Sequence, residues 1–118
     1  MYLQGTCVSY KVVIMSQQIE RIETMENNMN ACRKAVDALS EALEHYKSVL
    51  GQMEELSTYY GSPEWMSDYE DDEAGKLPED LRRGVLSEDL AYDLLVDNHE
   101  LIKEMLKVAS LGLDSEDR

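Results

Sequence analysis

Residues Gln18 to Met53 read QIERIETMENNMNACRKAVDALSEALEHYKSVLGQM, and this stretch decides the fold. Its apolar residues recur at alternating steps of three and four. Such steps average about 3.5 residues and keep one stripe of side chains facing a partner helix, whereas a strand would need a period of two. The stripe consists of Ile22, Met25, Met29, Cys32, Val36, Leu39, Leu43, Tyr46, Leu50 and Met53. The sequence therefore predicts a long amphipathic helix that requires a companion.

The chain length indicates a single domain, which we place over residues 16–110 and which the helical periodicity predicts to be all-α. The chain has 118 residues and a formal net charge of −14, from 25 acidic and 11 basic residues. This balance argues against a nucleic-acid ligand and against an anionic membrane surface, because both are bound through clustered Lys and Arg. We therefore expect neither nucleic acid nor membrane as a partner.

The N-terminal stretch, residues 1–15, is neither a convincing signal peptide nor a membrane span, because Ser9 and Lys11 interrupt its apolar residues. We expect an N-terminal extension that is disordered or lies outside the domain; the alternative is a short strand or arm that packs on the helices. Cys7 and Cys32 have no metal-ligand or disulfide-framework spacing. We interpret both as free thiols, which favours a cytoplasmic location.

The first helix is predicted over residues 17–58, with Ser16 as its N-cap. The asparagines of 27–30 and Gly51 are its weak points, because both residue types lower helix propensity. Gly61 is expected to close this helix in the left-handed conformation.

A second, short helix is predicted over 63–72, because Ser62 is a typical N-cap and Pro63 a typical first residue. Aromatic residues gather around this corner. A ligand pocket is one interpretation; we favour a small core that closes the end of a helical hairpin. The residues that form the corner are Tyr59, Tyr60, Gly61, Ser62, Trp65 and Tyr69.

The last helix is predicted over 88–109, with Ser87 as its cap and Glu88 and Asp89 at its positive end. Gly84 is expected to close a single turn that precedes it. Arg82 and Arg83 are expected to neutralise part of the acidic connector by ion pairs. Residues 111–118 form a polar tail.

The two long helices differ in length, and this difference predicts a homodimer. The last helix is about 33 Å long and the first about 60 Å. Folded back antiparallel, the last helix covers only about half of the stripe, and exposed apolar patches of that size mark interfaces. We expect the N-terminal halves of two first helices to pack together, with each last helix alongside; a break near 27–30 that folds the first segment back is the alternative. The expected interface is Ile19, Ile22, Met25, Met29 and Cys32.

Catalytic motifs are absent from the sequence, so we predict neither an enzyme nor a cofactor. Neither His45 nor His99 completes a Glu-x-x-His motif, and no phosphate loop or activated nucleophile is present. One pattern resembles the ligand spacing of an EF-hand calcium loop, with Glu73 where that loop requires Gly. These weak metal candidates are Asp68, Glu70, Asp72 and Glu79.

Several short motifs resemble one bacterial family of small helical proteins. They are Tyr59-Tyr60-Gly61-Ser62, Glu64-Trp65, Asp72-Glu73-Ala74-Gly75, Leu77-Pro78, Asp80-Leu81, Arg83 to Asp89 and Asp97-Asn98. On these residues the chain is identified as a member of the family called domain of unknown function 4298, from about Ile19 to Ala109. The resemblance implies a small bacterial cytosolic protein and supplies no activity, cofactor or site residue.

Two functions follow from the sequence. The first is a self-associating protein–protein interaction or structural module. The second is an acidic ligand module that binds a divalent cation or mimics the charge of nucleic acid. Salt dependence separates them, because binding by a charge mimic weakens at high ionic strength and an apolar seam does not.

Overall fold

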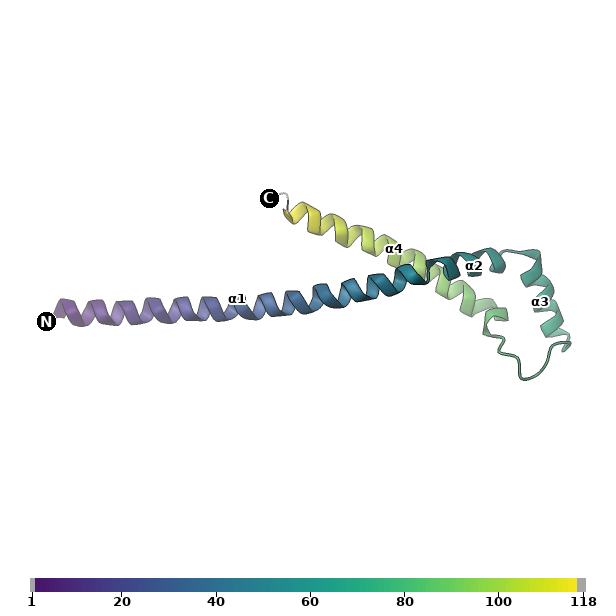
Figure 1. Cartoon of the computed structure of the whole chain (residues 1–118), viewed down its shortest axis with the longest axis horizontal. Coiled ribbons are helices and arrows are strands. Elements are labelled where there is room, and N and C mark those ends of the chain that lie inside the picture. The colour runs from purple at the N-terminus through teal and green to yellow at the C-terminus, as the bar shows by residue number, and fades with distance from the viewer. Residues whose placement is uncertain (1, 117–118) are drawn as a thin grey trace. The chain divides into compact units, whose positions relative to one another are not determined.

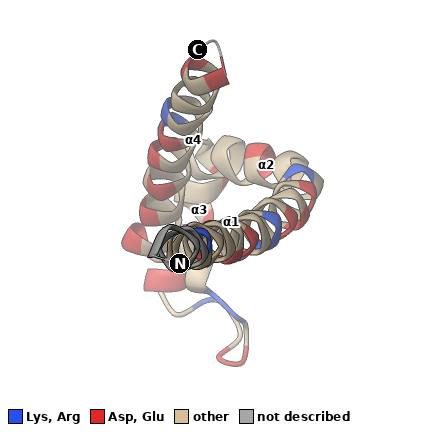
Figure 2. Cartoon of the chain, turned by 90° about the vertical axis from the view of Figure 1, so that its left-hand side faces the viewer, with Lys and Arg blue, Asp and Glu red and all other residues tan. Residues whose placement is uncertain are grey.

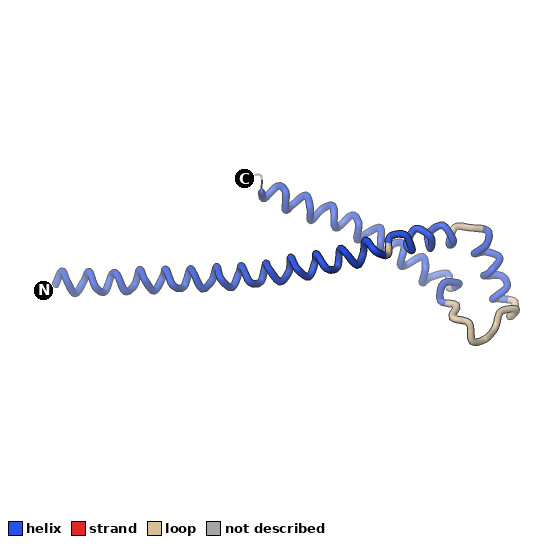
Figure 3. Tube along the Cα trace, in the orientation of Figure 1, coloured by secondary structure: helices blue, strands red, loops and turns tan. Residues whose placement is uncertain are grey.

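The computed structural model describes residues 2–116, with side chains from residue 9 onward, and no described residue lies in a strand (Figures 1 and 3). The predicted all-α fold is confirmed. Its elements are α1 (Tyr2–Ser48), α2 (Leu50–Tyr60), α3 (Pro63–Glu73), the 3₁₀ turn η1 (Gly84–Leu86) and α4 (Glu88–Glu116).

The chain divides into two units at residue 49, where the sequence analysis predicts one domain over 16–110. The first unit consists of α1. The second unit consists of α2, α3, η1 and α4. The predicted helix over 17–58 therefore spans the boundary between the units and corresponds to two helices.

α1 is longer at its N-terminus than predicted. It begins at Tyr2 and not near Gln17, so the segment expected to be disordered is helical from Tyr2 to Met15. Met1 lies outside the described residues, as does the side chain of Cys7. α1 also continues without a break through residues 27–30. Asn lowers helix propensity by less than about 0.7 kcal/mol per residue, which is too little to interrupt a helix of this length.

α1 ends at Ser48, three residues before the predicted weak point at Gly51. The Ser48 hydroxyl donates a hydrogen bond of 2.6 Å to the carbonyl oxygen of His45, so that a side chain competes for a helical acceptor. Val49 then leaves the helical region, with φ −104° and ψ 2°, and α2 begins at Leu50.

The corner between α2 and α3 is built by Ser62. Its Oγ accepts a hydrogen bond from the backbone N–H of Trp65 at 3.3 Å, and Pro63 is the first residue of α3, as predicted. The same hydroxyl donates to the carbonyl oxygen of Tyr59 at 2.6 Å. Gly61 differs from the prediction: its φ is −92°, so it is not left-handed. Ser62 satisfies the end of α2 through Tyr59, which removes the need for a left-handed residue.

Gly75 is the residue that takes the left-handed conformation, with φ +72°, and closes α3. The N–H of Lys76 donates to the Asp71 carbonyl, and the N–H of Gly75 donates to the Asp72 carbonyl, both at 3.0 Å. These two bonds form the Schellman motif, which requires a positive φ at the glycine position.

α4 starts as predicted and ends later. The Ser87 Oγ accepts from the backbone N–H groups of Asp89 at 3.3 Å and Leu90 at 3.4 Å. Gly84 opens η1 and does not close a preceding turn. The expected polar tail 111–118 is helical up to Glu116, and residues 117 and 118 lie outside the described part.

α2 and α4 contact each other as an antiparallel helical hairpin, and η1 contacts both α3 and α4. The hairpin is the predicted one, except that only α2 supplies its first arm. The hydrophobic core of the described residues is small and lies at the closed end of this hairpin. It contains Trp65, Leu86 and Ala91, which are 7%, 6% and 4% exposed.

Gly75 and Gly51 form a matched pair for testing the left-handed conformation of Gly75, because a Cβ added at either position meets no atom within 4 Å. Only the backbone angle separates them. Gly75→Ala should destabilise the second unit by about 1 kcal/mol, since φ is positive there. Gly51→Ala should stabilise it by up to about 1 kcal/mol, since alanine is the better helix former. Urea unfolding followed by far-UV circular dichroism measures both; equal effects would contradict the assignment of Gly75.

Candidate functional site

The aromatic corner of the second unit is organised around Trp65. Tyr69 stacks on its indole, with ring centroids 5.2 Å apart and an interplanar angle of 15°. Tyr60 approaches edge-on, with centroids 5.1 Å apart and an angle of 64°. Both geometries suit aromatic pairs, whose faces are negative and edges positive. The three rings thus pack against one another, as expected for a small aromatic core.

The polar atoms of these rings also bind within the protein. The Trp65 Nε1–H donates to the carbonyl oxygen of Val85 at 2.9 Å. The Tyr60 hydroxyl donates to the backbone carbonyl of Glu88 at 3.1 Å, and the Tyr69 hydroxyl donates to the Glu88 carboxylate at 3.1 Å. The Glu88 hydrogen bond, with the charge of Glu73 nearby, raises the pKa of Tyr69. These bonds fasten α2 and α3 to the first turn of α4, and α3 to η1.

Tyr59, the fourth aromatic residue of the corner, binds a carboxylate of α3. The Tyr59 hydroxyl donates a hydrogen bond of 2.6 Å to Oδ2 of Asp68. This bond, aided by partial burial and the carboxylate charge, raises the pKa of Tyr59 to about 12. A phenol held in its protonated form by its neighbour is a poor general base at neutral pH.

Arg83 holds the connector between α3 and η1. Its guanidinium forms an ion pair with Asp72 and also donates to the carbonyl oxygen of Pro78. Its Nε donates to the Leu81 carbonyl at 3.3 Å. Arg82 makes no hydrogen bond or ion pair with the described residues, so the two predicted connector arginines have different environments.

The four metal candidates do not come together. Asp68, Glu70 and Asp72 belong to α3, whereas an EF-hand presents its ligands from a loop. Asp68 binds Tyr59, and Asp72 binds Arg83. Among the described residues, no three His, Cys, Asp or Glu side chains are grouped so that they could hold a metal ion. The calcium-like spacing of Asp68 to Glu79 is therefore not supported.

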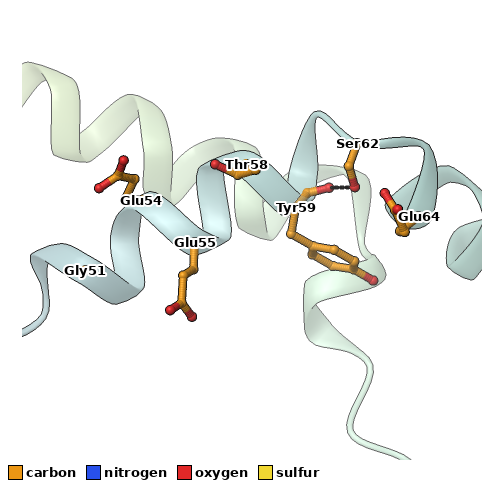
Figure 4. A pocket seen from close by; sticks show the side chains of 7 residues that line it. All are labelled: Gly51, Glu54, Glu55, Thr58, Tyr59, Ser62 and Glu64. Atoms are coloured by element: carbon orange, nitrogen blue, oxygen red, sulfur yellow. Dashed lines mark hydrogen bonds between the residues drawn. The ribbon is translucent and has the colours of Figure 1, made fainter.

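A shallow hollow lies along α2 and the start of α3 (Figure 4). Its lining is acidic and hydroxylic, and Glu54 and Glu55 point in different directions. A ligand site needs polar groups that converge on one point, so this hollow has no evident ligand geometry. The lining residues are Gly51, Glu54, Glu55, Thr58, Tyr59, Ser62 and Glu64.

The apolar stripe of α1 has a different character, because α1 is the only helix of its unit. We define the α1 stripe as Ile19, Ile22, Met25, Met29, Cys32, Val36 and Leu39. Ile19, Ile22, Met25 and Met29 are 54–59% exposed, and Cys32 is exposed as well. A single helix cannot cover its own side chains. The five residues predicted as an interface thus lie along one exposed face of α1.

The partners of the corner aromatics have no signal of their own in the sequence. Val85 and Glu88 accept the hydrogen bonds of these aromatics, although they lie 19 to 28 residues away from them in the sequence. The adjacency of Val85 and Leu86 to the Ser87 cap was the available signal. Two apolar residues before a helix cap indicate burial but not the residues that they contact.

Comparison with protein families identifies the relationship of the chain. The family described as "Domain of unknown function (DUF4298)" matches residues 22–108. The chain belongs to this family. The DUF4298 match begins within α1, at Ile22, and includes the aromatic corner, the connector and most of α4.

Other comparisons add no relative to this DUF4298 protein, since no curated protein and no solved structure matches it. Within its described residues, no helix is long and apolar enough to cross a membrane.

Trp65 should dominate the stability of the second unit. Trp65→Ala removes a side chain that is 7% exposed, and comparable core truncations cost about 3–5 kcal/mol. Trp65→Phe keeps a ring but loses the bond to Val85, so it should cost less. Urea unfolding followed at 222 nm measures both variants. Exposed Met66, the next residue of α3, supplies the control Met66→Ala, which should change stability by less than about 0.5 kcal/mol.

The Tyr59–Asp68 bond should make stability depend on alkaline pH. The folded-state pKa of about 12 lies above the ordinary value of 10.0, so the contribution is complete below pH 10 and is lost as the pH rises towards 12. Tyr59→Phe should therefore lower the free energy of unfolding by about 1 kcal/mol at pH 8, with a smaller difference from the parent protein at pH 11. Urea titrations at the two pH values measure this, and Tyr92→Phe, at an exposed ring, is the control. A pH-independent difference would contradict the assignment.

Proposed function

We propose that this protein is a self-associating helical module without catalytic activity, and that two copies bind each other through the α1 stripe. The observation that carries the proposal is an unbroken helix with apolar residues at heptad spacing and no other helix in its unit. Heptad stripes of this kind are covered by a second helix in coiled coils.

The continuity of α1 supports an intermolecular partner. The competing prediction required a break near residues 27–30 that would fold the first segment back on itself. α1 is helical through all four of these residues. A single straight helix has no second arm of its own with which to cover Ile22 or Met29, and exposed apolar patches of this kind are typical of interaction sites.

The distribution of charge also favours α1 as the contact. The first unit has 6 acidic and 5 basic residues, a net charge of −1; the second has 19 acidic and 6 basic residues, a net charge of −13. Two copies would repel each other strongly through their second units. Through α1 they meet almost without net charge.

The hydroxyl and carboxylate groups of the aromatic corner bind each other, which suits a structural role better than catalysis. We also propose a bacterial, cytoplasmic protein, because the motifs that define the resemblance are those of such a family and the two cysteines have no disulfide spacing.

The charge of the second unit favours one alternative, an acidic module that mimics nucleic acid. Acidic residues recur along α4 (Figure 2), and those of α3 and the connector add to them. Such a module would occupy a basic protein surface, and its binding would weaken as salt rises.

Sedimentation of α1 variants tests the proposed function. The parent protein should sediment as a dimer of 13.5 kDa chains at micromolar concentration, at low and at high salt. Ile22→Glu with Met29→Glu should give a folded monomer, because charges on the seam are desolvated on pairing. The urea unfolding curve of the second unit, followed by far-UV circular dichroism, should remain unchanged.

The matched control is Thr24→Glu with Ala31→Glu. It adds the same two charges seven residues apart, at exposed positions outside the stripe. The control should remain dimeric. A parent protein that is monomeric at both salt concentrations would overturn the proposal.

A further inference from the structure

We infer that the two α1 helices associate antiparallel, with the twofold axis between Met29 and Cys32, and that Glu26 and Arg33 select this orientation. The inference rests on the proposed function and specifies how the second copy sits on the α1 stripe. Its basis is the placement of charge along the chain, in the helix itself and in the unit that follows it.

The stripe defines the heptad positions. Ile22, Met29 and Val36 occupy a positions, and Met25, Cys32 and Leu39 occupy d positions. Antiparallel helices centred between Met29 and Cys32 pair each a residue with a d residue of the second copy. Met29 then faces Cys32, Met25 faces Val36, and Ile22 faces Leu39, so every layer from Ile22 to Leu39 is apolar.

Glu26 and Arg33 flank this seam at successive e positions. In the antiparallel register, e positions face e positions, so Glu26 of each copy lies opposite Arg33 of the other, and the symmetry produces two such pairs. In α1 itself, the Arg33 guanidinium binds Asp37 at 3.0 Å, with both side chains about two-thirds exposed. An exposed pair of this kind contributes little, and the guanidinium has donors for a second carboxylate.

The second unit provides the decisive difference between the orientations. Each copy carries a net charge of −13 in the unit that begins after Ser48. A parallel pair brings both of these units to the same end. In the antiparallel register, Ser48 lies opposite residue 13, so the two Ser48 residues are about 52 Å apart along the axis. That separation of the attachment points is more than six Debye lengths of about 8 Å, whereas a parallel pair places the two attachment points side by side.

A parallel pair would use a different charge contact. Its g positions face e positions of the next heptad, which places Arg21 of one copy opposite Glu26 of the other. Charge reversal therefore distinguishes the orientations. Glu26→Arg should weaken the dimer roughly tenfold in either case. A second charge reversal restores the dimer only if the substituted residue faces position 26 of the other copy.

The predicted rescue is Arg33→Glu. The double variant Glu26→Arg/Arg33→Glu should regain the parent dissociation constant to within about threefold, whereas Glu26→Arg/Arg21→Glu should remain as weak as Glu26→Arg alone. Sedimentation equilibrium measures all four proteins. Rescue by Arg21→Glu and not by Arg33→Glu would overturn the antiparallel arrangement while leaving self-association intact.

Spin-label distances provide an independent measurement on the full chain. In a background with Cys7→Ser and Cys32→Ala, a label at Ser48→Cys should report about 52 Å between copies, and a parallel pair would give less than about 20 Å. A label at Asn30→Cys, beside the twofold axis, should give a short distance in either orientation and so verifies pairing. Absence of a distance at both positions, with a monomer in sedimentation, would overturn the proposed function itself.

Discussion

A single α-helix cannot bury its own side chains, so the apolar face of α1 needs a second helix to cover it. Every residue of α1 from Ser9 to His45 is exposed, including the apolar residues of the α1 stripe, which are spaced three and four apart. The polar residues between them keep the helix in solution, but they leave one apolar face for a second helix to cover. The first unit has a net charge of only −1, so the α1 helices of two copies can approach each other with little repulsion. The second units of two copies, each at −13, would repel each other.

Few residues form the core of the second unit. Trp65 joins three elements: its ring packs against tyrosines of α2 and α3, and its N–H binds the backbone before α4. Because the indole combines a large apolar area with one donor, burial and a hydrogen bond fix the same side chain. Arg83 has a corresponding role in the connector, where it binds Asp72 and two carbonyl oxygens. Much of the acidic connector's charge stays in water.

The sequence predicted local structure well where a signal and its partner are close together. Ser62 and Ser87 cap helices through N–H groups two or three residues away, so the capping rule applies without knowledge of the fold. The same rules failed at glycines: Gly61 was expected to be left-handed, and Gly75 is. Several residues compete to satisfy the end of a helix, and at α2 the Ser62 side chain does so. Next to the helix break at Val49, the hydroxyl of Ser48 binds the His45 carbonyl, a side-chain contact that a propensity scale does not include.

The sequence by itself determined the helical class, the hairpin and the apolar stripe, because each follows from the periodicity of neighbouring residues. It also determined which residues form the aromatic corner. The tertiary structure decided which atoms those residues bind, since Tyr60 and Glu88 are 28 positions apart and no periodicity relates them. It likewise decided that Asp68, Glu70 and Asp72 belong to a helix, in which Asp68 binds Tyr59 and Asp72 binds Arg83, although their spacing resembles a calcium loop. Sequence spacing gives ligand types; only the backbone conformation decides whether their oxygens converge.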